Sequence, residues 1–346
     1  FGGMGDHWNV PACDFDPSGR YESRIQQTTD FHSQAVREWT ADHIEAGVHS
    51  TELFCDATVD FLTDRARRDS PFFAYVAFMA PHDPRTMPPE YLAMYRPDRV
   101  ELPPNFLAEH YFDNGELRVR DEVLAAIPRD EGEVRQHIAA YYAMITHLDD
   151  HIGRVLGVVE DLGLLEDTIV VFAGDNGLAV GQHGLLGKQN LYEHSVRVPL
   201  VFAGPAVPED QRRQALAGLI DIFPTLCDLA DVEVPESVEG ESLGLCFDDD
   251  GASVRDTMLF AYRHLMRGVR DGAGNKLIET AAAGQCHTQL FHLGRDPWEM
   301  RNLAGDPEHA EAVLLMRQAL TAWRDDFGDT QQDQGAAFWP QMEWAS

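Results

Sequence analysis

Residues 169–205, IVVFAGDNGLAVGQHGLLGKQNLYEHSVRVPLVFAGP, decide how the rest of the chain is interpreted. The stretch opens with β-branched and aromatic residues that stop at Gly174, a pattern typical of a strand buried on both faces of a mostly parallel sheet. A second apolar run, at 198–203, predicts another strand. The densest set of polar groups in the sequence lies between the two runs, so we expect the functional site there.

An acid and an amide follow the first predicted strand directly. Asp175 and Asn176 stand at its carboxyl end, where ligands bind in open α/β sheets, and their side-chain oxygens suit a hard cation. Gly177 permits a tight turn beneath them. A lone Asp-Asn-Gly is more often an Asx turn, so the functional interpretation depends on the residues that follow.

Lysine usage singles out Lys188. Lysine and arginine together number 27, but only two of these residues, Lys188 and Lys276, are lysines. A compact ammonium group with three rotatable donors can hold a tetrahedral anion in a way that a planar guanidinium does not. The three glycines of Gly-Gln-His-Gly-Leu-Leu-Gly-Lys let the backbone approach a bound group, so Lys188 is predicted to bind an anion rather than to be a chance surface lysine.

Together, Asp-Asn-Gly, Gly-Gln-His-Gly-Leu-Leu-Gly-Lys and Tyr-Glu-His-Ser-Val-Arg-Val-Pro-Leu resemble the metal-and-lysine segment of type I sulfatases in the alkaline phosphatase superfamily. The resemblance implies that Asp175 and Asn176 are two of four Ca²⁺ ligands, with Mg²⁺ as the alternative, and that Lys188 binds sulfate. It also implies an α/β fold with a mostly parallel central sheet flanked by helices, followed by a small C-terminal antiparallel sheet plus helix.

A histidine follows a further apolar run. Residues 71–79 predict a strand that ends in Ala-Pro-His-Asp-Pro, which places His82 at the same edge of the sheet as Asp175. An imidazolium there can donate to a sulfate oxygen or protonate a departing alkoxide. In sulfatases the matching histidine contacts the scissile ester, so the resemblance implies that role for His82; a structural loop histidine is the alternative.

The nucleophile of type I sulfatases is a formylglycine made from the cysteine of a Cys-x-Pro-Ser/Ala-x-Arg motif. None of the five cysteines here is followed by one residue and then proline. The two aspartates that complete the family's cation shell on its first strand are also missing. We therefore expect a protein whose N-terminal part lies outside this chain, and we expect the chain alone to bind metal poorly and to turn over little substrate.

Composition excludes several classes of function. The formal charge of −31 disfavours binding to nucleic acid or to anionic membranes. The cysteines are scattered without Cys-x-x-Cys spacing, so neither a zinc cluster nor a disulfide framework is indicated. No run approaches the roughly 20 apolar residues of a membrane span. The chain starts at Phe1 without methionine, so cytoplasmic and periplasmic or secreted locations both stay open, and the oligomeric state is not indicated.

The remaining patterns predict a helical scaffold and a β-rich C-terminal part. Apolar residues at three- and four-residue steps predict helices at 50–68, 133–165, 215–229 and 307–323. Short strands are predicted at 258–262, 266–270, 276–280 and 288–292, with Asp-Gly-Ala-Gly as a hairpin turn. Residues 231–255 are the best linker candidate, so we expect a sulfatase-like domain at 1–255 and a small α+β subdomain at 256–346.

Weaker candidates complete the predicted site. The substrate-binding candidates are His7, His183, His194, Arg263 and His264. By contrast, His147 and His151 lie one helical turn apart, a spacing that can bind a metal. The residues between them give no His-Glu-x-x-His pattern, so we interpret both as helix-face residues.

The predicted function is hydrolysis of sulfate monoesters, with a sulfated carbohydrate as the first choice of substrate and a small ester such as choline sulfate as the second. Three alternatives remain. A phosphatase or phosphodiesterase of the same superfamily is disfavoured because Asn176 stands where a zinc site would use histidine. The chain can also be a noncatalytic sulfate-binding remnant, or a fragment that does not fold alone because its sheet lacks a first strand.

Overall fold

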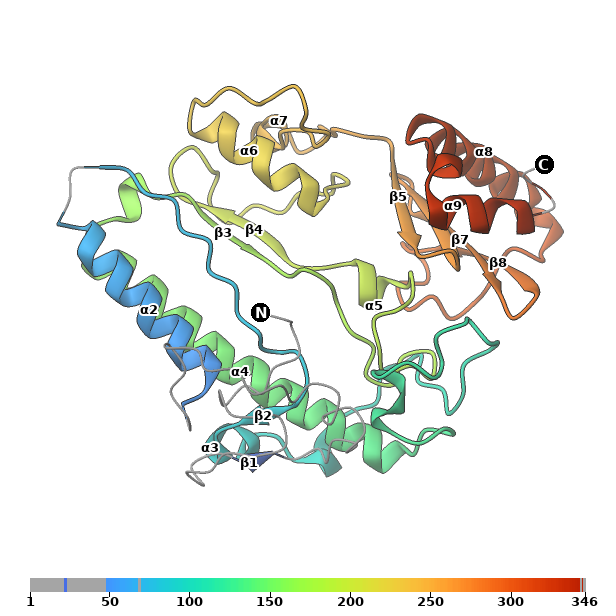
Figure 1. Cartoon of the computed structure of the whole chain (residues 1–346), viewed down its shortest axis with the longest axis horizontal. Helices are drawn as coiled ribbons and strands as arrows, with labels where there is room; N and C mark the ends of the chain where they lie inside the picture. Colours follow the sequence, from blue (N-terminus) through green and yellow to red (C-terminus); the bar gives the residue numbers. More distant parts are fainter. Residues whose placement is uncertain (1–21, 24–47, 68–69, 343, 345–346) are drawn as a thin grey trace. The chain divides into compact units, whose positions relative to one another are not determined.

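A computed structural model describes residues 22–23, 48–67, 70–342 and 344. The contacts within the chain divide it into two compact units, Phe1–Pro103 with Leu124–Thr168 (unit 1) and Pro104–Val123 with Ile169–Ser346 (unit 2). Figure 1 labels the helices and strands of both units. The boundary expected after residue 255 stays a prediction. Within the described residues, no helix is both long and apolar enough to cross a bilayer.

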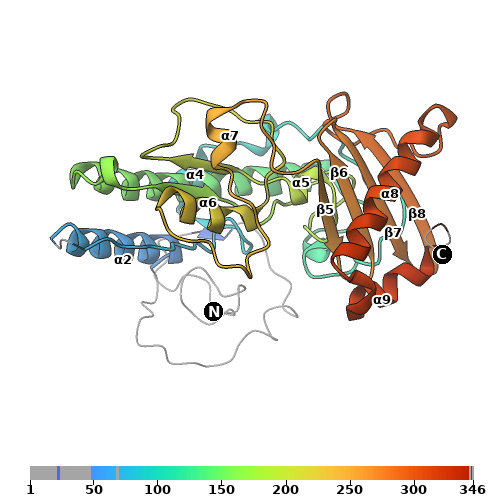
Figure 2. The ribbon, with the colours of Figure 1, turned by 90° about the horizontal axis from the view of Figure 1, so that it is seen from above.

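Unit 1 is built on two long helices that lie side by side (Figures 1 and 2), α2 (Ser50–Arg65) and α4 (Glu131–Asp161). Each begins at a side chain that accepts a backbone N–H, because the first turn of a helix leaves such donors unsatisfied. His49 Nδ1 accepts the Thr51 N–H at 3.2 Å, and Asp130 Oδ1 accepts the Glu133 N–H at 2.9 Å. These helices confirm the predictions for 50–68 and 133–165.

The shorter elements of unit 1 pack against α4. They are β2 (Thr86–Met87), α3 (Pro89–Ala93) and the 3-10 helix η1 (Pro97–Arg99), while β1 (Glu22–Ser23) pairs antiparallel with β2. A small apolar core joins β2 and α3 to α4 through Ala80, Met87, Leu92, Ala140, Ala143 and Met144. Residues 84–103 of unit 1 thus form only short elements and loops.

One predicted strand of unit 1 is absent from the structure. Residues 71–79 adopt no regular secondary structure, and Phe73 and Tyr75 are 76% and 84% exposed. Apolar composition predicts a strand only where a neighbouring strand supplies hydrogen bonds and cover. The described part of the chain pairs no strand with this run, so the prediction of a buried strand there is wrong for this structure.

A buried histidine in unit 1 is kept neutral by its surroundings. His137, on α4, contacts the guanidinium of Arg85, and both side chains are almost fully buried. Burial, reinforced by the positive charges of Arg85 and Arg129, lowers the pKa of His137 to about 3. The neutral imidazole therefore belongs to the folded state.

The two strands of the central segment, β3 (Val170–Ala173) and β4 (Leu200–Ala203), pair antiparallel in unit 2. Both strands were predicted, but the expectations of burial on both faces and of a parallel neighbour are wrong here. Phe172 is 43% exposed and Val201 is 52% exposed, because the described residues pair no further strand with β3 or β4. Of the mostly parallel central sheet that we expected, the described residues contain only this antiparallel pair.

After β4 the chain forms η4 (Leu219–Asp221), α6 (Ile222–Leu229) and α7 (Gly244–Asp248). The side chain of Asp221 is fully buried and receives two hydrogen bonds from Arg255, one of them at 2.6 Å. It also accepts the N–H groups of Gly218 and Glu241 at 2.7 and 3.0 Å. Glu241 and Arg255 are thus bonded to Asp221, the residue that precedes α6, and α7 lies between them in the sequence.

The C-terminal sheet contains β5 (Thr257–Tyr262), β6 (Met266–Asp271), β7 (Asn275–Ala282) and β8 (Gln285–His292), antiparallel in that order. The Gly274 N–H donates to the Asp271 carbonyl, and Gly274 has a φ of +94°, so the predicted hairpin turn is confirmed. The 3-10 helix η5 (Pro307–His309), α8 (Ala310–Asp326) and α9 (Asp333–Phe338) follow, which confirms the prediction for 307–323.

Side chains alternate between the two faces of this sheet, as period-two strands require. Leu277 and Leu290 face a core formed with α8 and α9, whereas Ile278 and Phe291 face a second core formed with the segment that precedes α5 (Glu193–Val196). In Figure 2, α8 lies across the sheet. The central segment therefore packs on the face that the C-terminal helices leave open.

A buried lysine reinforces this packing. Lys276, on β7, is fully buried, and its Nζ lies 2.8 Å from Glu193 Oε1 and 2.9 Å from Glu299 Oε1. Arg270 also pairs with Glu193, at 3.3 Å, and the Glu193 N–H donates to Glu299 Oε2 at 2.7 Å. Burial raises the pKa of Glu299, and the ammonium of Lys276 opposes that shift. The network fastens α5 to the sheet.

Lys276→Met is expected to lower the free energy of unfolding of unit 2 by about 3–5 kcal/mol, because two buried carboxylates lose their shared cation. Urea unfolding followed by circular dichroism measures this loss. Arg301→Met is the control, since Arg301 is 77% exposed and its contact with Asp306 is 3.6 Å long. We expect that control to cost less than about 1 kcal/mol. Equal effects of the two substitutions would contradict the role given to Lys276.

Acid is expected to destabilise unit 1 through His137. Its pKa is about 3 in the folded chain and 6.5 ordinarily, so the unfolded chain binds the extra proton first. The contribution of neutral His137 to the free energy of unfolding is complete above about pH 6.5. It declines by up to about 1.4 kcal/mol per pH unit as the pH falls toward 3. Urea unfolding between pH 4 and 7 should show that the free energy of unfolding falls less steeply with decreasing pH in His137→Gln than in the wild-type chain. The same slope in both would refute the role given to His137.

Candidate functional site

The polar segment between β3 and β4 is held in shape by its own backbone. The Gly177 N–H donates to the Ser195 carbonyl at 2.9 Å, and the Ala179 N–H donates to the Gly187 carbonyl at 3.0 Å. These two bonds connect the Asp-Asn-Gly turn, the glycine-rich loop and α5. Residues far apart in the segment are therefore fixed relative to one another.

Asp175 and Asn176 lie at the exposed tip of this arrangement. Asp175 Oδ1 accepts the Asn176 N–H at 2.8 Å, and both residues are exposed. A Cβ added to Gly177 would lie 2.0 Å from the carbonyl oxygen of His194, so glycine is required at that position. The carboxylate and amide oxygens fit a hard cation such as Ca²⁺ or Mg²⁺, although they supply only part of the six to eight oxygens that Ca²⁺ takes.

A buried acid shapes the loop that precedes Lys188. The Glu122 carboxylate, 3% exposed, accepts the N–H of Leu186 at 2.9 Å and the N–H of Gly187 at 2.8 Å. A Cβ on Gly187 would approach Glu122 Oε1 to 2.9 Å, so a side chain there would displace the carboxylate. The third glycine of the loop therefore serves close packing against Glu122.

Lys188 itself lies near a second buried acid. Asp121 accepts a hydrogen bond from Gln189 Nε2 at 2.8 Å. Burial raises the pKa of Asp121, but the bond from Gln189 and the positive charges of Arg120 and Lys188 outweigh it and hold that pKa below its ordinary range. The described residues place no carboxylate within ion-pairing distance of Lys188 Nζ, so the ammonium is available to an anion.

His183 and His194 lie in an aromatic cluster. The rings of His183 and Tyr192 stack with centroids 4.1 Å apart, and His194 lies 5.7 Å from His183. His183 Nε2 accepts from Asn105 Nδ2 at 3.1 Å, and burial lowers its pKa to about 3. Burial also lowers the pKa of His194 well below the ordinary histidine range. Both imidazoles are neutral and pack under the loop, while their contact with substrate stays a prediction.

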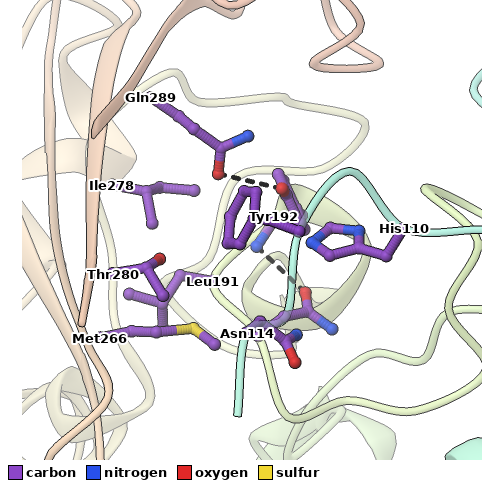
Figure 3. A pocket seen from close by; sticks show the side chains of 10 residues that line it. His110, Asn114, Leu191, Tyr192, Met266, Ile278, Thr280 and Gln289 are labelled. Atoms are coloured by element: carbon purple, nitrogen blue, oxygen red, sulfur yellow. Dashed lines mark hydrogen bonds between the residues drawn. The ribbon is translucent and has the colours of Figure 1, made fainter. Parts of the chain in front are cut away.

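A small pocket lies beside this cluster, against the C-terminal sheet (Figure 3). The Tyr192 hydroxyl donates to Gln289 Oε1 at 3.0 Å, and its N–H donates to Asn190 Oδ1 at 3.1 Å. The pocket is lined by His110, Phe112, Asn114, Asn190, Leu191, Tyr192, Met266, Ile278, Thr280 and Gln289. The lining includes neither a carboxylate nor a lysine, so it lacks the groups expected of the reaction centre.

In unit 1, His82 follows the irregular run 71–79. Its Nδ1 donates to the Asp83 carbonyl at 2.7 Å and lies 3.5 Å from Asp83 Oδ1. The side chain is 24% exposed, so part of the ring stays accessible. This geometry is compatible with a proton donor.

The other candidates lie on β-hairpin connections or outside the described residues. Arg263 bonds Glu116 Oε1 at 3.0 Å and is 60% exposed, while exposed His264 lies 3.3 Å from Gln334 Oε1. His7 lies outside the described residues.

Sequence patterns gave no signal for the buried acids Asp121 and Glu122 that support the lysine loop. They lie more than 60 residues before Leu186, Gly187 and Gln189, the residues they contact. A second Asp-Asn-Gly, at 113–115, forms an ordinary turn. Asp113 Oδ1 accepts the Gly115 N–H at 2.9 Å.

Comparison with protein families gives two matches. A model described as Sulfatase matches residues 9–232, and a model described as N-sulphoglucosamine sulphohydrolase, C-terminal, matches residues 181–326. The first spans more than half of the chain and includes the whole segment from β3 to β4. The second spans the glycine-rich loop, α5 and the C-terminal sheet.

The chain is 31% identical over 315 residues to the multifunctional alkaline phosphatase superfamily protein PehA of Trinickia caryophylli, covering 80% of this chain and 60% of that protein. It is 29% identical over 303 residues to an arylsulfatase of Clostridium perfringens, covering 84% and 60%. A solved structure of BT4656 with its substrate D-glucosamine-2-N,6-O-disulfate superposes with a TM-score of 0.71 at 23% identity, covering 84% of this chain and 72% of that chain.

The structural match identifies the alkaline-phosphatase-like α/β fold, with the antiparallel sheet in the C-terminal region. The chain spans about 60% of the length of PehA and of the arylsulfatase. The sulfatase model covers residues 9–232, including the turn with Asp175 and Asn176 and the loop with Lys188. On these grounds the chain belongs to the sulfatase family.

Proposed function

We propose that this chain provides the cation and anion contacts of an enzyme that hydrolyses sulfate monoesters. The observation that carries the proposal is the segment between β3 and β4. There an exposed acid–amide pair and a lysine without a described ion-pair partner are fixed by one set of backbone hydrogen bonds. Membership of the sulfatase family supports the reaction class.

In this proposal Asp175 and Asn176 hold Ca²⁺, or Mg²⁺ in its place. A bound cation would spread the negative charge of the nonbridging sulfate oxygens. The oxygen donors and the solvent exposure of the pair favour such an ion over Zn²⁺, which prefers nitrogen and sulfur. Backbone packing at Gly177 keeps both side chains at the tip of the turn.

Lys188 binds a sulfate oxygen in the same proposal. Its loop is already fixed by Glu122, so the loop loses little further conformational entropy when the anion binds. The carboxylate of Asp121 keeps the local charge balanced when no anion is bound. His82 is proposed separately, from its own surroundings and from the resemblance of residues 80–84, as the donor to the leaving oxygen.

A sulfated carbohydrate is the proposed substrate class. The match of residues 181–326 to the C-terminal part of N-sulphoglucosamine sulphohydrolase supports it, as does the sulfated glucosamine bound in the similar structure. Arg263 and His264 lie within that matched range and are proposed to contact the sugar. The competing proposal is phosphate ester hydrolysis by a member of the same superfamily, because PehA is named as a multifunctional alkaline phosphatase superfamily protein.

Turnover of 4-nitrophenyl sulfate tests the function. Because the chain has no Cys-x-Pro sequence, the assay uses a protein in which the nucleophile segment of a sulfatase relative precedes residues 1–346. We expect Lys188→Ala to lower kcat/KM by about 10²–10³-fold, since a donor to the developing charge is lost. Exposed Arg212→Ala is the control and should leave the rate unchanged.

Two results would reject this assignment. One is an equal loss of activity in Lys188→Ala and Arg212→Ala. The other is faster hydrolysis of 4-nitrophenyl phosphate than of the sulfate ester, which would favour the phosphatase.

The repeated tripeptide supplies a matched test of the cation site. Asp175→Ala is expected to weaken Ca²⁺ binding about tenfold or more, because one of few charged oxygen ligands is removed. Asp113→Ala removes the same residue from the second Asp-Asn-Gly and should have no effect. Calorimetric titration with Ca²⁺ of the same protein, in which a relative's segment precedes residues 1–346, measures both, and equal affinities for the two variants would count against the site.

A further inference from the structure

A second cluster of metal-binding side chains lies in unit 1, on residues that the proposed sulfatase chemistry does not use. Glu52 comes from α2, and His147 and His151 come from α4. One potential ligand atom from each residue lies within 4.8 Å of the other two. We propose that these three side chains bind a transition-metal ion of the Zn²⁺ type.

The helices bring the three side chains together. Residues four apart share one face of a helix, so both histidines point from the same side of α4. The rings of His147 and His151 lie 4.9 Å apart, edge to face. Packing of α2 along α4 brings Glu52 to the same place, a contact that spacing on α4 alone does not reveal.

The donor set decides the kind of ion. Two imidazoles and one carboxylate are a combination that Zn²⁺ accepts with a fourth ligand from water, whereas Ca²⁺ prefers oxygen donors only. Zn²⁺ bonds of about 2.1 Å place tetrahedral donors about 3.4 Å apart, so small side-chain rotations close the cluster around the ion. The proposed ion therefore differs in kind from the one expected at Asp175 and Asn176.

The surroundings suit metal ligation as well. His147 is 1% exposed, and its ring is packed between those of His49, at 4.7 Å, and Tyr91, at 5.0 Å. Burial lowers the pKa of His151, which favours the neutral imidazole that a metal requires. The Nδ1 atom of His151 is buried and finds no hydrogen-bond partner among the described residues.

A neighbouring hydrogen bond helps to fix the cluster. The Tyr91 hydroxyl donates to Asp150 Oδ2 at 2.7 Å, which holds the residue next to His151 and the ring that covers His147. Bound metal would connect α2 to α4 directly. The role inferred for the ion is thus structural, and it does not depend on the proposed hydrolase activity.

Metal titration of the whole chain tests this inference. After treatment with EDTA, the chain is titrated with Zn²⁺ in competition with a chromophoric chelator, and with Co²⁺, whose visible absorption reports a tetrahedral site with nitrogen ligands. We expect one tight Zn²⁺ per chain. His147→Gln, His151→Gln and Glu52→Gln should each weaken binding about tenfold or more, because each removes one of three protein ligands.

His309→Gln is the matched control, since His309 precedes α8 in unit 2 and its side chain does not cap that helix. It should leave Zn²⁺ affinity and the Co²⁺ spectrum unchanged. Thermal unfolding gives a second measurement: Zn²⁺ should raise the midpoint of the wild-type chain but not that of His151→Gln. Far-ultraviolet circular dichroism without metal verifies that each variant is folded.

The inference is overturned if the wild-type chain binds no more Zn²⁺ than folded His151→Gln does. It is equally overturned if folded His151→Gln and Glu52→Gln retain wild-type affinity.

Discussion

The buried ammonium of Lys276 is the contact on which the geometry of unit 2 depends. A charge removed from water is stable only when paired, and here the partners come from α5 and from the loop after β8. Since Glu193 begins α5, the same ion pair that balances the sheet also positions the segment carrying Asp175 and Lys188. The geometry of the candidate site and the electrostatics of the core are thereby coupled through one residue.

Apolar packing also fixes the glycine-rich loop between β3 and β4 against the C-terminal sheet. Ile278 and Phe291 face the same core as Leu185 and Leu191, so the sheet supports the segment over its length rather than at one end. Glu122 then orients individual backbone N–H groups beside Lys188. Asp175 and Asn176, the proposed cation ligands, lie at the exposed tip of the segment.

Local sequence patterns predicted the parts of the fold that are stabilised by neighbours along the chain. The alternation in β5 to β8 and the helical periodicity of α4 both gave elements close to those observed. The strand predicted at 71–79 is not formed because a strand exists only with a hydrogen-bonded neighbour. The composition of this run carries no information about whether such a neighbour is present. The exposure of Phe172 on β3 has the same cause.

The candidate site shows a similar division. Asp175, Asn176 and Lys188 stood out because they follow an apolar run and because lysine is rare, signals that are local or compositional. The same scarcity also marked Lys276, whose buried role emerges only from the tertiary structure. Glu122, Asp121 and the pairing of Glu52 with the helix histidines depend on contacts between segments distant in sequence, which no spacing within one segment encodes.

The contact between Gly177 and the carbonyl of His194 makes the Asp-Asn-Gly turn inseparable from the start of α5. The turn cannot be transplanted as a tripeptide, because a new host would need an equally close backbone and an acceptor like that of Ser195. The smallest transferable module is the whole loop from β3 to β4. Recombination between relatives should therefore tolerate crossovers before residue 170 or after residue 203 better than any crossover between them.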